Sequence, residues 1–207
     1  MANIFRKLTA SEIETKVCME YPNGGVDIAV YKDARVDANI LDETVGPMNW
    51  QKEYTNSNRN CIVHILDSKT QRWISKEDTG EGMGKALASD SFKRAGFAWG
   101  IGRELYTCPH IYFRPEELSE DFHEVNDRFE VTEIAYDEDV IKTISILNVT
   151  TGIEKRFTRG NEKAGGEVVK GSPRKKEERP EKAEWAPKTE TVRQFSGAAF
   201  GKERVTA

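Results

Sequence analysis

The chain has 207 residues, of which 37% are hydrophobic and 32% charged, and its net charge is −4. This balance allows a core for only part of the chain and does not by itself argue for nucleic-acid binding, so any basic surface must come from folding that gathers a few cations. The sequence has no apolar stretch of roughly 18 residues, no signal-like opening and only three cysteines. We therefore expect a cytoplasmic protein without a membrane span.

The first part of the chain predicts a helix, a strand and a second helix. Residues 7–20 contain a capping signature and a modest apolar stripe, which predict a short helix. Residues 21–31 contain a Pro-Asn-Gly-Gly turn followed by alternating apolar residues, which indicate a turn that leads into a strand. Apolar residues at helical spacing then predict a helix over residues 33–44.

The middle of the chain predicts an antiparallel meander and one long helix. Three short stretches between residues 50 and 79 are rich in aromatic and β-branched residues and are separated by turns. From residue 85 to 101, apolar side chains recur on one helix face, at Ala88, Phe92, Ala95 and Trp99. We predict an α+β fold whose β-β-β-α core packs the meander on the long helix.

Composition divides the chain into three predicted domains. Residues 1–115 form the core. Residues 116–139 hold eleven acids and one base, and apolar residues alternate from Val131 onward, so we predict an acidic connector and a two- or three-stranded β-hairpin accessory over 116–159. Residues 160–207 are rich in Lys, Glu, Gly and Pro and contain no Leu or Ile, which predicts a disordered tail.

A glycine pair near the end of the long helix raises the question of a nucleotide-binding enzyme. Gly100 and Gly102 form a Gly-Ile-Gly motif, but a dinucleotide loop needs GxGxxG at a helix N-terminus, and position 105 is Leu. A helix C-terminus has the wrong partial charge for a phosphate, so a cap and turn explain these glycines better. No HxxxH, GxSxG or CxxC motif is present. We expect no catalytic residue, no metal site and no cofactor.

The same helix carries cations beside its apolar stripe. Lys93 and Arg94 are adjacent, Lys85 lies two turns earlier and Arg103 follows the helix. Such residues on a rigid helix can hold successive phosphates, because Arg offers a bidentate fork and Lys a point charge. From the residues alone, an ordinary exposed Lys-Arg pair is the other interpretation.

The segment "KALASDSFKRAGFAWGIGRELY" (residues 85–106) resembles the signature helix of the Rad-fifty-two-type single-strand annealing proteins, in particular their bacteriophage and prophage (Sak-like) branch. The segment "YKDARVDANILDETVGPMNWQKEY" (residues 31–54) is similar to the strand, helix and sheet entry of that family. "CIVHI" and "RWISKEDTGEG" are similar to its meander strands and the following loop. The resemblance covers roughly residues 8–113.

This resemblance implies an α+β core that assembles into a ring or a helical oligomer. It also implies a protein that anneals single-stranded DNA without ATP in recombination and repair. In the family, the DNA lies in a basic groove around the oligomer, with its backbone inward and its bases displayed for pairing. The implied partners are single-stranded DNA and further copies of the chain, in the cytoplasm of a bacterial host if a phage encodes the protein.

Individual residues match the DNA-binding positions of the family. Lys93 and Arg94 match its backbone-binding Lys-Arg pair. Arg35 matches its groove arginine, and Lys85 matches a basic position at the start of the long helix. The chain departs from the eukaryotic branch at Phe97, where that branch has a further DNA-contacting arginine, and Arg103 is our candidate to supply this charge.

Other interpretations stay open at this point. A non-annealing protein that only coats single strands would share the basic groove and would slow the pairing of complementary strands. A binder of double-stranded RNA is a further alternative, because the β-β-β-α order also occurs in that class. The motif "QFSGAAF" (residues 194–200) near the end of the tail is a candidate contact for a single-strand-binding protein.

Overall fold

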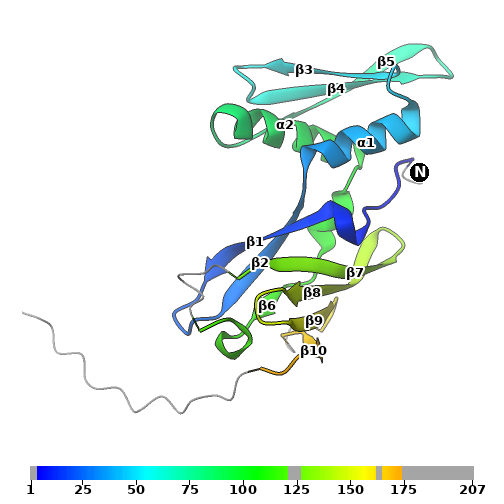
Figure 1. Ribbon diagram of the computed structural model, residues 1–207. Helices are drawn as coiled ribbons and strands as arrows, with labels where there is room; N and C mark the ends of the chain where they lie inside the picture. Colours follow the sequence, from blue (N-terminus) through cyan, green and yellow to red (C-terminus); the bar gives the residue numbers. More distant parts are fainter. Residues whose placement is uncertain (1–3, 121–126, 162–164, 174–207) are drawn as a thin grey trace, which may run out of the picture. The chain divides into compact units, whose positions relative to one another are not determined.

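The computed structural model describes residues 4–120, 127–161 and 165–173 (Figure 1). Within them the chain forms two α-helices and three antiparallel sheets, so the predicted α+β class is confirmed. The sheets have the strand orders β1-β2-β6, β3-β4-β5 and β10-β9-β8-β7. No helix among these residues is long and apolar enough to cross a membrane.

The N-terminal segment is a strand where the sequence predicted a helix. A capping box is present, but it closes only one 3-10 turn, η1 (Ala10–Glu12). The chain continues as strand β1 (Ile13–Glu20), so the prediction of a helix over residues 7–20 is wrong. The physical reason is a period of two in the β-branched residues, which favours a strand that pairs with its neighbour. These residues are Ile13, Thr15 and Val17.

The predicted turn and strand follow. Strand β2 (Val26–Lys32) pairs antiparallel with β1, and the short strand β6 (Tyr112–Phe113) pairs with the other edge of β2. Gly24 has φ +85° in the turn between β1 and β2, a backbone conformation that favours glycine. The turn-strand prediction for this segment is confirmed.

Helix α1 (Ala34–Val45) confirms the predicted second helix. The side chain of Asp33 caps it by accepting a hydrogen bond of 2.8 Å from the backbone N–H of Arg35. Gly46 ends the helix with φ +86°. Residues next to the helix therefore determine where both of its ends lie.

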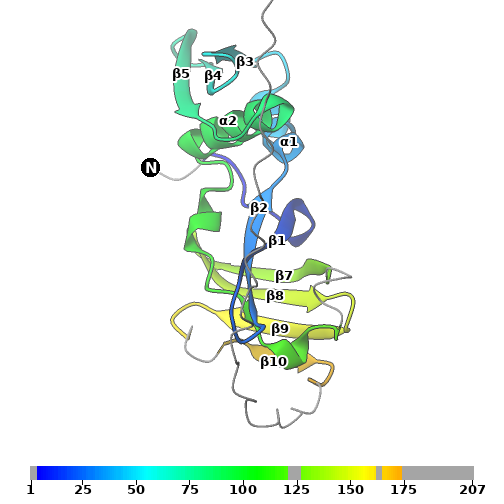
Figure 2. The ribbon, with the colours of Figure 1, turned by 90° about the vertical axis from the view of Figure 1, so that its left-hand side faces the viewer.

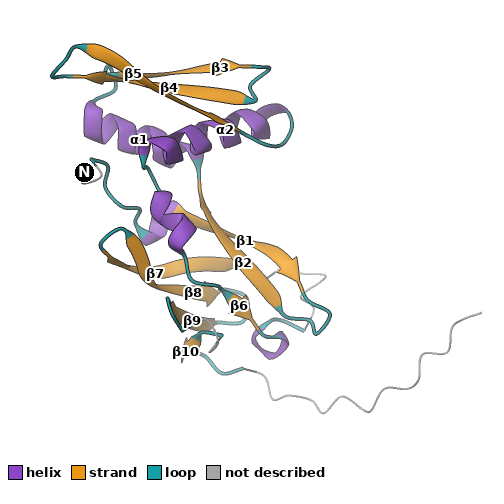
Figure 3. Cartoon of the chain, turned by 180° about the vertical axis from the view of Figure 1, so that it is seen from behind, coloured by secondary structure: helices purple, strands orange, loops and turns teal. Residues whose placement is uncertain are grey.

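The predicted meander is also present. Strands β3 (Trp50–Thr55), β4 (Asn60–Asp67) and β5 (Arg72–Thr79) pair in that order, all antiparallel. Helix α2 (Gly84–Trp99) follows, and Figures 1 and 3 show α1 and α2 on the same face of the meander. Direct contacts join α2 to the meander, since the rings of Phe92 and Trp50 stack with their centroids 6.0 Å apart.

The glycine pair after α2 forms a cap and a turn. Gly100 adopts the left-handed conformation, with φ +106°, and its N–H donates to the carbonyls of Gly96 and Phe97 at 3.0 Å. Gly102, with φ +72°, then begins the 3-10 helix η2 (Arg103–Thr107). The interpretation of these glycines as a helix terminus is confirmed.

A third sheet follows the 3-10 helix η3 (Pro115–Glu117) (Figure 2). Its strands are β7 (Phe129–Asp137), β8 (Val140–Asn148), β9 (Ile153–Thr158) and β10 (Glu167–Lys170). The predicted two- or three-stranded β-hairpin is confirmed by β7, β8 and β9, and β10 adds a fourth strand to this sheet.

The expected disorder after residue 160 is wrong for residues 165–173, because they contain β10, which pairs with β9. Two valines at 168 and 169 provide the strand signal in this otherwise polar segment. The remainder of the predicted tail, 174–207, lies outside the described residues, as do its motif at 194–200 and part of the acidic connector, 121–126.

Hydrogen bonds tie the third sheet to the first part of the chain. Thr15 Oγ1 donates to the carbonyl of Phe129 at 2.6 Å, and the Tyr136 hydroxyl donates to the carbonyl of Leu8 at 2.8 Å. The described residues on both sides of position 115 belong to one compact unit. The third sheet therefore contacts β1 directly.

A buried ion pair lies between β2, α1 and α2. Lys32 at the end of β2 and Asp37 on α1 form this pair, and both side chains are 0% exposed. The ammonium of Lys32 also donates to the carbonyl of Lys93 at 3.1 Å and lies 4.2 Å from the centroid of the Phe97 ring. Burial raises the pKa of Asp37 to about 6, so the desolvation of its carboxylate outweighs the favourable charge of Lys32.

Alanine at Gly96 is expected to destabilise the fold by about 1–3 kcal/mol. A Cβ at this position would lie 1.9 Å from Asp37 Oδ1, an oxygen that Lys32 holds in place. This clash exceeds the gain of about 1 kcal/mol that alanine brings in helix propensity. Urea unfolding of Gly96→Ala tests the effect. The same substitution should cost little in an Asp37→Ala background, and an equal loss in both backgrounds would contradict the steric explanation.

Candidate nucleic-acid interface

A cavity of about 480 Å³ lies between helix α2 and the β1–β2 hairpin. Strands β1 and β2, helix α2 and the 3-10 helix η2 all contribute to its lining. Most of the large or polar side chains that line this cavity are cations or aromatic rings. They include Lys16, Tyr31, Lys93, Phe97 and Tyr106. Proteins that bind single-stranded nucleic acids combine these same two kinds of residue, because phosphates are anionic and bases are flat.

Two lysines from different elements approach one aromatic ring. The ammonium nitrogens of Lys16 and Lys93 lie 5.8 and 5.7 Å from the centroid of Tyr31. The strand register explains the first contact, because Glu14 lies opposite Tyr31 and Lys16 follows two residues later on the same face. The second lysine comes from α2. Two positive charges from separate elements therefore lie close to the Tyr31 ring.

Acidic side chains also lie close to this cluster. Asp90 Oδ1 lies 3.8 Å from Lys93 Nζ, one helix turn away. Lys93 keeps 22% of its side chain exposed, and Lys16 is exposed on β1. Burial, followed by the nearby Glu14 carboxylate, raises the pKa of Tyr31, so its hydroxyl keeps its proton at neutral pH.

Phe97 and Tyr106 form an aromatic pair in the same cavity. Their ring centroids lie 4.9 Å apart, with an angle of 51° between the planes. Phe97 is four residues after Lys93, so both lie on one face of α2. Tyr106 belongs to η2 and is 68% exposed. The guanidinium of Arg103 ties η2 to the end of α2 by donating to the carbonyl of Phe97, at 3.0 and 2.8 Å.

The structure separates the predicted Lys-Arg pair. Consecutive residues of an α-helix point roughly 100° apart, so Lys93 lines the cavity whereas Arg94 faces the meander. Arg94 Nε lies 3.3 Å from Asp78 Oδ1 on β5, with 43% of its side chain exposed. Arg94 therefore contacts a carboxylate of the meander and not the Tyr31 ring that Lys93 approaches.

Arg35 and Lys85 are both exposed at the first turns of their helices. Arg35 keeps 88% of its side chain exposed, and its Nε donates to Asp33 Oδ1 at 2.7 Å. Hydrogen bonds from Arg35, and then the charge of Lys93, lower the pKa of Asp33, so this carboxylate lies within electrostatic reach of both cations. Lys85 is about two turns before Lys93 on α2, away from the cavity lining.

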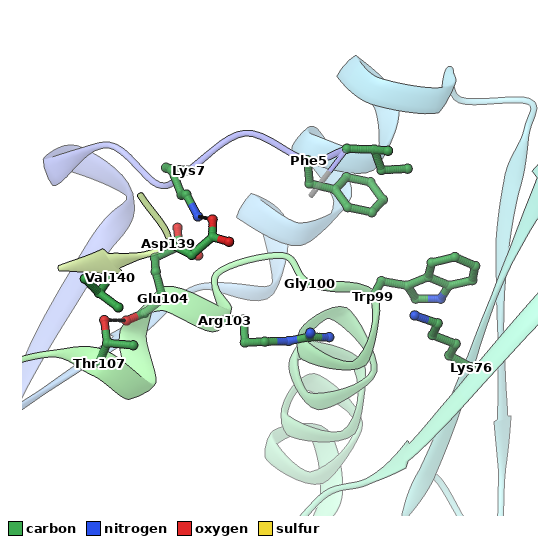
Figure 4. A pocket seen from close by; sticks show the side chains of 11 residues that line it. Phe5, Lys7, Lys76, Trp99, Gly100, Arg103, Glu104, Thr107, Asp139 and Val140 are labelled. Atoms are coloured by element: carbon green, nitrogen blue, oxygen red, sulfur yellow. Dashed lines mark hydrogen bonds and ion pairs between the residues drawn. The ribbon is translucent and has the colours of Figure 1, made fainter. Parts of the chain in front are cut away.

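Arg103 lines a different cavity, of about 560 Å³, at the C-terminus of α2 (Figure 4). Its guanidinium donates to the carbonyls of Phe97 and Ala98, and Lys76 Nζ donates to Ala98 at 2.9 Å. These cations add hydrogen bonds to carbonyls at the C-terminal end of the helix, where the partial charge of the helix is negative. Lys7 pairs with Asp139 in the same cavity. This geometry explains Arg103 as a cap of α2.

The sequence analysis missed Lys16, Tyr31 and Tyr106. Tyr31 had a usable signal, because the apolar residues of its strand alternate at 26, 28 and 30, which places an aromatic at 31 on the opposite face. Lys16 had none, since only its pairing with β2 brings it to the cavity. Tyr106 had no signal either, because its position in the cavity depends on how the chain turns back after α2.

Reactive groups are sparse around this surface. Burial raises the pKa of Cys61 to about 11 and that of Cys108 to about 12, so neither thiol is a ready nucleophile at neutral pH. In the described part of the chain, no three His, Cys, Asp or Glu side chains gather as metal ligands would.

Comparisons with known proteins do not assign this chain to a family. No protein-family model, curated protein or solved structure matches it. Functional assignment therefore rests on the residues of the cavity and on the sequence motifs around it.

Proposed function

We propose that the protein binds the phosphates of single-stranded DNA in the cavity between α2 and the β1–β2 hairpin, and that it anneals complementary strands without ATP. The observation that supports this most directly is the approach of Lys16 and Lys93, from two separate elements, to within 5.8 and 5.7 Å of the Tyr31 ring. Contacts to phosphates supply most of the affinity for nucleic acids and carry no sequence information. Such contacts suit a protein that leaves the choice of partner to base pairing.

Annealing follows from charge neutralisation. Two complementary strands repel each other through their phosphates, and a protein that holds one backbone on lysines lowers this repulsion while the base edges stay free. In this proposal, Lys85 and Arg94 on α2 and Arg35 on α1 extend the basic track beyond the cavity. Arg103 contributes through the position of η2.

Self-association completes the proposal. In a ring or helical oligomer of copies, each with its meander on α2, the same few cations recur along the DNA. Repetition compensates for the net charge of −4, because the local charge of the groove attracts the DNA. We propose that this assembly acts in the cytoplasm, which is that of the bacterial host if a phage encodes the protein.

An annealing assay without ATP tests the function. Complementary oligonucleotides that carry a fluorophore and a quencher should pair faster with the wild-type protein than in buffer. Lys93→Ala/Arg94→Ala should lose most of this acceleration, whereas Lys69→Ala/Lys170→Ala, which removes the same charge from the β4–β5 turn and from β10, should keep it. Electron microscopy of the same samples should show ring-shaped or helical particles.

Each result decides between interpretations. Tight binding of single strands with slower pairing would favour a coating protein over an annealing protein. Renaturation no faster than in buffer, together with a monomeric protein in the presence of DNA, would overturn the proposal.

A further inference from the structure

Tyr106 has the position of a base-stacking platform, and this inference rests on the proposed function. We propose that a base of the bound strand stacks on the exposed ring of Tyr106 while Lys16 and Lys93 hold the flanking phosphates. The ligand is thus a nucleotide unit of the strand, recognised by its charge and by its flat face. A platform of this kind has no preference for a particular base, because every base has a π-face.

The exposure of Tyr106 is the first support. A large aromatic side chain normally buries most of its surface, yet Tyr106 is 68% exposed and lines the same cavity as the two lysines. Its neighbour Leu105 is buried. The 3-10 helix η2 therefore anchors its backbone with one side chain and presents the next one to the cavity.

The rigidity of this segment is the second support. The Phe97 ring packs against Tyr106 at a centroid distance of 4.9 Å, and the ammonium of Lys32 fixes Phe97 from within the fold, 4.2 Å from its centroid. Thr107 Oγ1 donates to the carbonyl of Glu104 at 2.6 Å and accepts from the N–H of Ile141 at 2.8 Å, which joins η2 to β8. A ring on an anchored backbone loses little conformational freedom when a base stacks on it.

Stacking is compatible with annealing because it uses the face of a base and leaves its pairing edge free. Stacking on an aromatic side chain strengthens binding by about fivefold to 150-fold for each base. The phosphate contacts of Lys16 and Lys93 are independent of the base. The two contributions can therefore be separated with a ligand that keeps its phosphates and lacks its bases.

The test compares an oligothymidylate with an abasic oligomer of the same length and charge. The wild-type protein should bind the oligothymidylate at least about fivefold more tightly. Tyr106→Ala should bind both ligands equally, at the affinity that the wild type has for the abasic oligomer, whereas Tyr106→Phe should keep the preference. An oligonucleotide that contains 2-aminopurine should lose fluorescence on binding to the wild type and keep it with Tyr106→Ala.

Separate outcomes distinguish this inference from the proposed function. If Tyr106→Ala keeps the full preference for bases, or if the wild type has none, the platform is wrong while phosphate binding stands. If the wild type binds neither ligand, both proposals are overturned. Lys16→Ala should weaken the binding of both ligands by the same factor, and a loss confined to the oligothymidylate would contradict its assignment to phosphates.

Discussion

Asp37→Ala is expected to lower the free energy of unfolding by about 3–5 kcal/mol, because it leaves the buried ammonium group of Lys32 without its counter-ion. Both side chains of the pair are 0% exposed, so water cannot replace the lost carboxylate. Urea unfolding at neutral pH measures the change. Arg35→Ala, which breaks the exposed pair with Asp33 on the same helix, should cost at most about 1 kcal/mol.

The double variant Lys32→Met/Asp37→Leu separates the cost of one unpaired charge from the value of the pair. Burial raises the pKa of Asp37, and its Oδ2 has no hydrogen-bond partner within the described part of the chain. An incompletely satisfied buried pair contributes little net stability, so the double variant should be as stable as the wild type or more stable. A double variant as unstable as Asp37→Ala would show that the pair itself stabilises the fold.

Lys16→Glu/Lys93→Glu is expected to weaken the binding of single-stranded DNA on the order of 100-fold at low salt, since two charge-assisted contacts are lost. The plot of log affinity against log salt should become shallower by about 1.4, which corresponds to two phosphate contacts on a single strand. Fluorescence anisotropy with a labelled oligonucleotide across a range of salt concentrations measures both quantities.

The matched control is Lys69→Glu/Lys170→Glu. It changes the net charge by the same amount at positions on the β4–β5 turn and on β10, outside the cavity. If long-range charge alone attracts DNA, both double variants should lose affinity equally, and the cavity would not be the binding site. A loss confined to the Lys16 and Lys93 variant is the expected result.

Elements with a local cause were predictable from the sequence. Helix α1 has a capping carboxylate at Asp33 and a glycine stop at Gly46, and the meander strands are bounded by turn residues. Strand β1 was not predictable, because the residues of this segment fit both a helical period and a strand period. Leu8, Ile13 and Val17 suggest a helix, whereas Ile13, Thr15 and Val17 suggest a strand. Pairing with β2 decides between them, and this is a non-local interaction.

In the candidate site, too, some features were predictable from the sequence and others depend on non-local contacts. Lys93 was identified from the sequence. The helix period alone explains why the side chain of Arg94 points in a different direction from that of Lys93. The approach of Lys16 to Tyr31 requires the register of β1 against β2, which no single-residue pattern contains. The contact between Phe97 and Tyr106 requires the turn through Gly100 and Gly102 that brings η2 back beside α2.

The hydrogen bond from Lys32 to the carbonyl of Lys93 has a consequence for genetic screens. Neither member of the Lys32–Asp37 pair is accessible to a phosphate, yet both set the position of the helix segment that carries Lys93. If the protein anneals DNA in recombination as proposed, selections for defective recombination should therefore return substitutions at 32 and 37 together with those at 16 and 93. Protein abundance in the cell will tell the two groups apart, because interior substitutions reduce it and surface substitutions do not.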